Sequence, residues 1–423
     1  MTHPLALKTV DAVADLLADP ATAPMGPDAS LHRQHLAYGP TGIALLHIER
    51  AAAGLGPWQR AHEWLTAAAR QPFTSGPDSH PFYGAPALAY AMACVADHLP
   101  GAYQRARGIL DRQMGADSRR RLEAAHRRID RGCLPEYAEF DTIRGLAGYG
   151  AYFLRRDPSG AHVSAILDYC VRLTEPVTYG GEVLPGWWTL SGPSGRQDDR
   201  FPGGHANHGM AHGIGGVLAL LALAARRGIT VGGHREAVRT ILAWLDRWQE
   251  KTDRGEAWPY WVTRDELRTG RPDPSLPRRP SWCYGTAGLA RARQLAALAL
   301  GDTDRQVEAE NALVSALTDR AQLKATTDNG LCHGFSGLAH IAARIADDAH
   351  PSTAGQLRAA IPPLLTAACP SGIVPEDTAR AVIQDEEAGP GFLNGAAGMA
   401  LALLAPATTA PPQSAWDTCL LIA

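Results

Sequence analysis

The chain has no long apolar run and no strong charge of either sign. Its apolar stretches, such as residues 216–225, are too short to cross a bilayer. Residues 1–17 lack the basic region and apolar stretch of a secretory signal. The formal net charge is -3, so no overall basic field points to nucleic acid. We therefore expect a cytoplasmic protein with no transmembrane segment and no nucleic-acid partner, which could reach a membrane only through a complex.

The chain also lacks the cysteine pattern of a disulfide-rich protein. Its cysteines number 7, which is odd, and a reducing compartment disfavours disulfides. Functional cysteines are therefore expected to be metal ligands or nucleophiles, whereas the others are expected to be core residues. The sequence contains no phosphate-binding loop of the form GxxxxGK[ST] either.

One short motif recurs along the chain: a glycine, two residues, a second small residue, and then an apolar run with helical spacing. Its seven copies begin at Gly39, Gly84, Gly145, Gly213, Gly285, Gly334 and Gly395. The second copy has Ala87 where the others have the second glycine. Such repetition is typical of an architecture assembled from one supersecondary unit. The paired small residues should let the backbone approach its neighbour closely.

Each copy is expected to open a buried helix, because Ala and Leu dominate all sides of the segment that follows. These inner helices are expected at residues 43–50, 88–98, 149–155, 217–227, 289–300, 338–347 and 399–404. Amphipathic segments predict outer helices at 10–18, 57–69, 103–129, 162–173, 235–249, 303–321 and 353–368. Alternating helices of this kind can close into a double ring. We therefore predict an all-α fold, an α/α toroid of seven inner and seven outer helices, as a single domain over residues 1–423.

Two long connections, at 175–207 and 251–282, interrupt the helical pattern. They are rich in Gly, Pro, Trp and Arg, and loops of this length in a compact domain are usually functional. The first has room for a short hairpin within residues 177–190, as a small inserted β-rich segment. The tryptophans of these loops either form walls for a peptide or pack locally, and both interpretations stay open. They are Trp187, Trp188, Trp258 and Trp261.

Reactive residues occupy matching positions in the repeats. Cys283 and Cys332 each stand two residues before the first glycine of their copy, and His212 and His333 stand one residue before it. In a toroid these positions would converge at one end of the ring. Two thiolates and one imidazole suit a zinc ion with an open fourth position, and nearby helix N-termini favour the thiolate. We therefore predict one zinc ion bound by Cys283, Cys332 and His333.

Several motifs together resemble the signatures of the lanthionine synthetase C-like family, which includes the stand-alone lantibiotic cyclases. They are Ala211-His212-Gly213, Trp282-Cys283-Tyr284-Gly285, Cys332-His333-Gly334, Asp141-Thr142-Ile143-Arg144-Gly145, Leu393-Asn394-Gly395 and the terminal Trp416-Asp417 with Leu420-Leu421. The resemblance covers nearly the whole chain. It implies an α/α toroid with zinc on two cysteines and one histidine, and an acid/base pair formed by His212 and Asp141.

The reaction that this resemblance implies is the addition of a peptide Cys thiol to dehydroalanine or dehydrobutyrine. The substrate would be a dehydrated precursor peptide with its leader, and the product lanthionine or methyllanthionine. A free thiol with a pKa of about 8.5 is only about 3% ionised at neutral pH, so the metal would supply thiolate. His212 would transfer a proton, and Asp141 would orient it. Nothing in the chain is left to dehydrate Ser or Thr, so a separate dehydratase and a peptide exporter are expected as partners.

The residues beside the zinc set are expected to contact the peptide. They are Trp282, Tyr284 and Arg279. Two further histidines, His205 and His208, precede His212 closely in sequence, and we expect them on a surface loop.

Three alternatives stay open. A related enzyme could use the same zinc chemistry to add glutathione or another free thiol to dehydroamino acids. A prenyltransferase-type toroid also activates a thiol with zinc, but its ligands include Asp. A non-catalytic zinc scaffold of a peptide-modifying complex would need a closed site with four ligands, and His212 is the one further residue in the same register.

Overall fold

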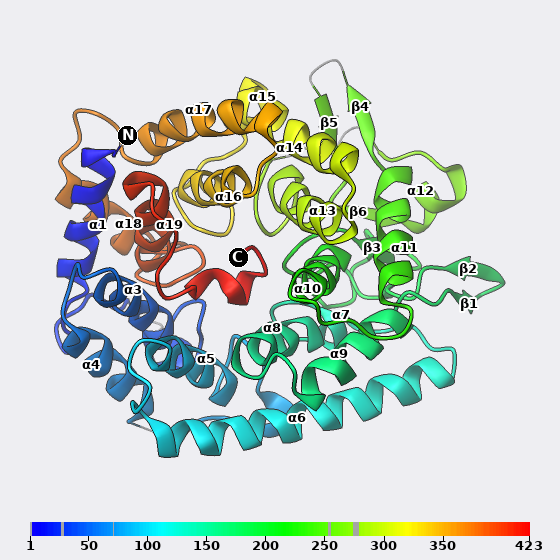
Figure 1. Cartoon of the computed structure of the whole chain (residues 1–423), viewed down its shortest axis with the longest axis horizontal. Coiled ribbons are helices and arrows are strands. Elements are labelled where there is room, and N and C mark those ends of the chain that lie inside the picture. The colour runs from blue at the N-terminus through cyan, green and yellow to red at the C-terminus, as the bar shows by residue number, and fades with distance from the viewer. Residues whose placement is uncertain (1, 27–28, 71, 253–254, 274–278) are drawn as a thin grey trace.

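The computed structural model describes residues 2–26, 29–70, 72–252, 255–273 and 279–423 of the chain. Its helices alternate along the chain between an inner and an outer ring (Figure 1). The inner ring comprises α3 (Pro40–Ala52), α5 (Ala85–Ala96), α8 (Leu146–Arg156), α10 (Ile214–Arg226), α13 (Thr286–Leu300), α16 (Phe335–Asp347) and α19 (Ala396–Thr408). The outer ring comprises α1 (Pro4–Leu16), α4 (Trp58–Ala69), α6 (Gln104–Asp130), α9 (Ala161–Arg172), α11 (His234–Arg247), α14 (Thr303–Thr318) and α17 (Pro351–Ala368). The predicted α/α toroid is confirmed.

Every inner helix begins directly after the first glycine of its repeat, and that glycine is the N-cap residue. The inner helices therefore start about one turn earlier than their apolar runs suggested. The second glycine packs against the turn before the helix. A Cβ at Gly337 would collide with the carbonyl oxygen of Leu331, and one at Gly288 would collide with that of Trp282. The close backbone approach predicted from the repeat is thus between each helix and its own preceding turn.

Burial differs between the two rings as their sequences predict. In α10, every residue from Ile214 to Ala224 is buried, which fits a helix that is apolar on all sides. In α11, the buried residues recur at helical spacing on one side, at Ala237, Val238, Ile241, Leu242 and Leu245. The ring is closed by helices from the two ends of the chain, because α1 and α3 both pack against α19.

The long connections carry short strands and a short helix. The expected hairpin is present as β1 (Val177–Tyr179) paired with β2 (Glu182–Leu184). β3 (His205–Asn207) pairs with β6 (Trp261–Thr263), which joins the two connections to each other. A further hairpin, β4 (Glu250–Thr252) with β5 (Gly255–Ala257), and α12 (Arg264–Thr269) complete this side of the molecule. Residues 253–254 and 274–278 of the second connection lie outside the described residues.

Besides the C-terminal 3-10 turn described below, five further helical segments of the described residues lie outside the two rings and were not predicted. The longest is α18 (Pro375–Gln384), which packs against α1. The short ones are α2 (Ala29–His32), η1 (Gly76–Asp78), α7 (Tyr137–Phe140) and α15 (Arg320–Lys324).

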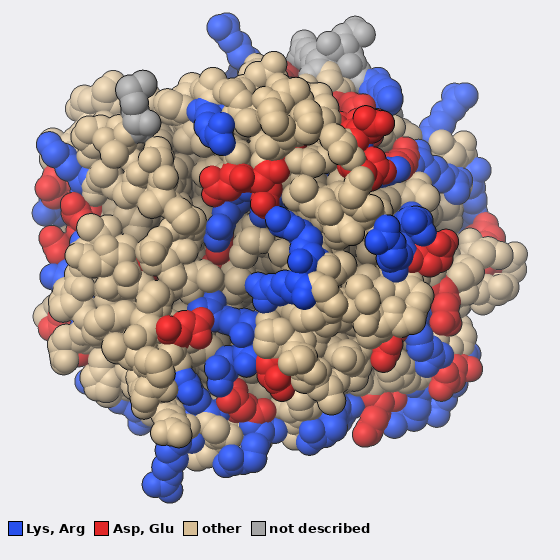
Figure 2. Space-filling view, in the orientation of Figure 1, with Lys and Arg blue, Asp and Glu red and all other residues tan. Residues whose placement is uncertain are grey.

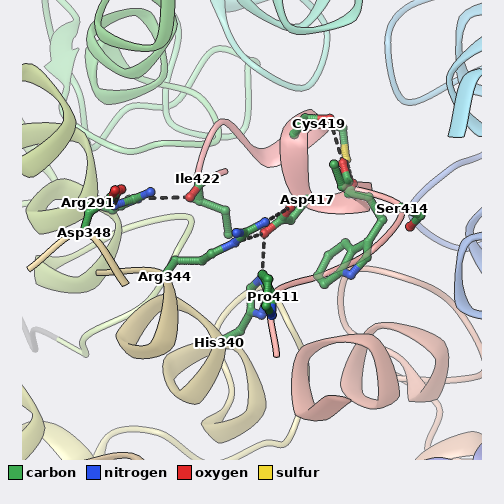
Figure 3. Close-up of polar contacts among 12 residues, drawn as sticks. Arg291, His340, Arg344, Asp348, Pro411, Ser414, Asp417, Cys419 and Ile422 are labelled. Carbon is green, nitrogen blue, oxygen red and sulfur yellow. Dashed lines mark hydrogen bonds and ion pairs between the residues drawn. The ribbon is translucent and has the colours of Figure 1, made fainter. Parts of the chain in front are cut away.

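The C-terminal segment ends at the centre of the ring (Figure 1), where it forms η2 (Trp416–Leu420). Asp417 is fully buried and accepts hydrogen bonds from Arg344 and His340 of α16, and Arg291 of α13 donates to the Ile422 carbonyl (Figure 3). On this face of the molecule a central hollow is bordered by basic and acidic side chains (Figure 2). The segment therefore joins inner helices that are distant in sequence.

Among the residues that the structure describes, every helix is too short or too polar to cross a bilayer.

Candidate active site

The turns that precede the inner helices are joined to one another by backbone hydrogen bonds. The donor and acceptor pairs are Leu36 to Phe82 (2.9 Å), Phe392 to Ala37 (2.7 Å), Thr142 to Ala211 (3.1 Å), Trp282 to Cys332 (3.1 Å) and Cys332 to Leu393 (2.8 Å). Each bond connects two different repeats. Because these turns all lie at the N-terminal ends of the inner helices, residues in the same register meet at one end of the ring.

The residue immediately before the first glycine is polar in all seven repeats. These residues are Tyr38, Tyr83, Arg144, His212, Tyr284, His333 and Asn394. Each is exposed or half-buried, whereas the glycine that follows it is buried. We call these seven residues the polar collar. Sequence reasoning singled out His212, Tyr284 and His333 and missed the other four, although the same register would have found them.

The two cysteines of the candidate zinc set lie side by side beneath the collar. The two thiols are close enough to interact, and the interaction lowers the pKa of Cys283 and raises that of Cys332. A positive charge on His333 also lowers the Cys283 pKa, whereas burial raises the pKa of both thiols. Ser281 Oγ lies 3.6 Å from Cys283 Sγ. Cys283 is therefore the thiol of the pair that ionises more readily.

His333 is held by a carboxylate. Its Nδ1 lies 2.7 Å from Asp328 Oδ2, so Nδ1 is the donor and Nε2 is left with its lone pair in the neutral ring. The His333 side chain is 25% exposed. It borders a cavity of about 430 Å³ whose lining also includes Arg279, Asp328 and Asn394. An oriented imidazole with a free Nε2 is the arrangement that metal-bound histidines commonly have.

His212 forms a second histidine–carboxylate pair. Its Nδ1 lies 2.6 Å from Asp141 Oδ2, and Asp141 is fully buried while the His212 side chain is 28% exposed. The other carboxylate oxygen of Asp141 accepts from the backbone N–H groups of Arg144 and Gly145. Asp141 therefore both closes the turn that precedes α8 and fixes the orientation of His212, with Nε2 directed away from the pair.

A network of side chains from α7 and the first long connection supports His212 and Tyr284. The Tyr137 ring stacks on His212 with centroids 5.9 Å apart. Asn207 Nδ2 lies 3.3 Å from the hydroxyl oxygens of both Tyr137 and Tyr284. The Tyr137 hydroxyl also bonds His205 Nε2 at 2.9 Å. Burial raises the pKa of both tyrosines, so they stay neutral.

The expected surface position of His205 and His208 is wrong. Both are fully buried, because β3 draws this segment into the molecule against β6. His208 Nδ1 donates to the Pro259 carbonyl at 2.9 Å, and its Nε2 accepts from Trp244 Nε1 at 2.9 Å.

The aromatic residues predicted to contact a peptide differ in their exposure. Trp282 is 1% exposed, and its indole donates to the Leu420 carbonyl at 3.0 Å, so it links the turn of Cys283 to the C-terminal segment. Tyr284 is half-buried, with its ring 6.0 Å from that of Trp261. The other three loop tryptophans are buried and pack locally: Trp187, Trp188 and Trp258.

Comparison with known proteins matches this arrangement to one family. The family model described as lanthionine synthetase C-like protein matches residues 30–421. The chain belongs to the lanthionine synthetase C-like family. This lanthionine synthetase C-like protein is 28% identical over 208 residues to the nisin biosynthesis protein NisC of Lactococcus lactis subsp. lactis, and the match spans 48% of each chain. The aligned part is thus about half the length of that curated relative.

The fold of this lanthionine synthetase C-like protein also matches a solved structure titled nisin cyclase. The TM-score is 0.77 with 20% sequence identity, and the match covers 97% of this chain and 96% of that chain. A likeness at this identity shows that the two share the fold. The toroid predicted from the glycine repeat is therefore the fold of the family.

The candidate ligands of this lanthionine synthetase C-like protein suit zinc by their chemistry. Within the described residues, no three His, Cys, Asp or Glu side chains are already arranged as a metal cluster. The donor types nevertheless fit, because two buried thiols lie close enough to shift each other's pKa and the His333 imidazole is oriented by Asp328. Thiolate and imidazole are the preferred ligands of zinc.

Proposed function

We propose that this protein forms thioether bonds in a dehydrated lanthipeptide precursor. A Cys thiol of the peptide adds to dehydroalanine or dehydrobutyrine in the same peptide, which closes a lanthionine or methyllanthionine ring. Family membership supports this reaction class, and the observation that carries the proposal is a pair of thiols and an oriented histidine at the same end of the ring. Cys283 and Cys332 supply the thiols, and His212 is held at 2.6 Å by Asp141.

Cys283, Cys332 and His333 would hold one zinc ion. A zinc ion in this set would lower the pKa of a substrate thiol, so that the thiolate is available at neutral pH. Asp328 would keep His333 Nε2 available through its bond to Nδ1.

In the addition, the substrate sulfur forms a bond to the β-carbon, and the electron pair of the carbon–carbon double bond moves toward the amide as an enolate. The α-carbon then takes a proton. His212 would deliver it from Nε2, because Asp141 occupies Nδ1 and stabilises the charged ring before transfer. The proton lost by the substrate thiol balances the one that the product gains. Such proton transfer typically contributes about 10²- to 10⁴-fold to the rate.

The partners expected from the sequence follow from this reaction. The substrate would arrive with its Ser and Thr residues already dehydrated by a separate enzyme, and the product would leave through an exporter in a cytoplasmic complex. An enzyme that adds glutathione instead would use the same residues, so the product distinguishes the two.

Replacing His212 tests the proposed proton transfer. We expect His212→Ala to keep the zinc content of the wild type and to slow ring formation about 10²-fold or more, because zinc and proton transfer depend on different residues. Zinc is measured by metal analysis, and rings by mass spectrometry after thiol alkylation. Ring formation at the wild-type rate would show that His212 has no such role, and adducts of added glutathione in place of rings would show the alternative activity.

A further inference from the structure

Five collar residues have no role in the proposed reaction, and three of them come from consecutive repeats. These three are Tyr38, Tyr83 and Arg144, from the first, second and third repeats. Behind the two tyrosines stand His35 and His80, each four residues before the first glycine of its repeat. We call these five residues the aromatic–arginine sector.

The rings of the sector are packed together. The His35 ring centroid lies 4.6 Å from that of Tyr83 and 5.6 Å from that of Tyr38. The His80 ring lies 5.7 Å from Tyr83, and its Nδ1 bonds the carbonyl of Ile143 at 3.1 Å. Because Ile143 directly precedes Arg144, this bond joins the ring cluster to the arginine.

Arg144 is the one charged member of the sector at neutral pH. Burial and, to a smaller extent, the positive charge of Arg144 lower the pKa of His35 to about 4 and that of His80 to about 3. Both rings are therefore neutral at pH 7. The Arg144 side chain is exposed, and its guanidinium forms no hydrogen bond or ion pair with any described residue.

Two carboxylates of the surrounding segments already have partners. Asp141 binds His212 and two backbone N–H groups, one of them that of Arg144 itself. Asp198, in the connection whose Gly195 lies beside Arg144, is paired with Arg200 at 2.7 Å. The planar Arg144 guanidinium is thus free to donate two parallel hydrogen bonds beside neutral rings. Such a bidentate donor binds carboxylates well.

The sector borders the thiol pair. Tyr38 is close enough to Cys332 for a charge on that thiol to raise the tyrosine pKa, and Arg144 acts on the same tyrosine in the opposite direction. A group bound at Arg144 would therefore lie within the same opening as the substrate thiol.

We propose that Arg144, flanked by Tyr38 and Tyr83, binds a carboxylate of the peptide substrate. The identity of the ligand as a peptide rests on the proposed function, whereas the binding itself requires no reaction. The carboxylate could come from an Asp or Glu side chain or from a free peptide C-terminus. The chemistry at Arg144 is the same in both cases.

Binding of three short peptides to the full chain tests this proposal. All are acetylated, contain one Cys and no dehydroamino acid, and differ only in charge: one has a Glu side chain and an amidated end, one has Gln and a free C-terminal carboxylate, and one has Gln and an amidated end. Calorimetry is performed on the wild type, Arg144→Gln and Arg144→Lys. Arg131→Gln is the matched control, because Arg131 is exposed at the end of the outer helix α6.

We expect at least one carboxylate peptide to bind the wild type about tenfold or more tightly than the neutral peptide, as a charged hydrogen-bond pair predicts. The preference should disappear in Arg144→Gln, weaken in Arg144→Lys and persist in Arg131→Gln. Which of the two carboxylate peptides is preferred identifies the source of the carboxylate.

Equal binding of all three peptides by the wild type, or an unchanged preference in Arg144→Gln, would overturn the proposal. If Arg144→Gln fails to fold, an unchanged preference in Arg144→Lys would overturn it instead. Because these peptides cannot be cyclised, failure here leaves the cyclase proposal standing. If the preference is found but a dehydrated precursor peptide gives no ring in a separate assay, only the cyclase proposal fails.

Discussion

Replacing Asp328 by Asn should weaken zinc binding while leaving the fold intact. Asp328 accepts from His333 Nδ1 at 2.7 Å with one oxygen and from the Gly330 N–H at 2.8 Å with the other. Asn can keep one oxygen acceptor of similar shape, but it removes the negative charge that makes the imidazole a better ligand. Loss of such a partner typically costs about 10- to 100-fold in metal affinity, which corresponds to about 1.4–2.7 kcal/mol.

The affinity is measured by competition with a chromophoric chelator at fixed pH, with the wild type and Asp15→Asn in parallel. Asp15 is 71% exposed on α1, so its substitution removes the same charge without touching the site. We expect Asp328→Asn to lose zinc at a chelator concentration at which both controls retain it. Affinities that agree within about twofold would refute the role given to Asp328 and count against His333 as a ligand.

Two further substitutions test how buried groups stabilise the ring. Burial lowers the pKa of His208 from its usual value of 6.5 to about 4 in the folded protein. The buried neutral ring therefore gives its full contribution to the free energy of unfolding above about pH 6.5. That contribution, about 3 kcal/mol, is lost as the pH falls from 6.5 to 4. His208→Gln should therefore reduce the dependence of unfolding free energy on pH between 6.5 and 4, and an unchanged dependence in urea titrations would contradict this. Asp417→Asn should lower the unfolding free energy by about 3–5 kcal/mol, because Arg344 would keep a largely buried charge without its partner. A loss below about 1 kcal/mol would show that the pair contributes little to stability.

The architecture was predictable because one short motif carries it. The paired small residues mark each place where a helix folds tightly against its own preceding turn, so seven copies locate the inner helices. The helix α18 was missed because it belongs to no repeat, although Pro375 at its start and the acidic first turn are ordinary helix signals.

The site residues that could be predicted from sequence were those with a fixed position relative to the first glycine of a repeat or within a family motif. Cys283, Cys332, His333 and His212 share positions relative to a glycine, and Asp141 was matched through the family motif. Sequence alone did not reveal the partner of His333, since Asp328 acts through a turn of five residues.

The supporting network was not predictable for a different reason. Tyr137 reaches His205 and Asn207 across about 70 residues of chain, and this contact exists only because β3 and β6 pair. The burial of His205 and His208 follows from the same pairing. Local polarity suggests a surface loop there, and tertiary structure overrides it.

Ring formation on a dehydrated precursor peptide tests the proposed function most directly. The purified protein is incubated with zinc and the peptide, the remaining thiols are alkylated, and the products are analysed by mass spectrometry. We expect one alkylatable thiol to disappear for each ring formed, with no other change in peptide mass, and Cys283→Ala to abolish this loss. An unchanged number of free thiols in the presence of the zinc-loaded wild type would contradict the assignment.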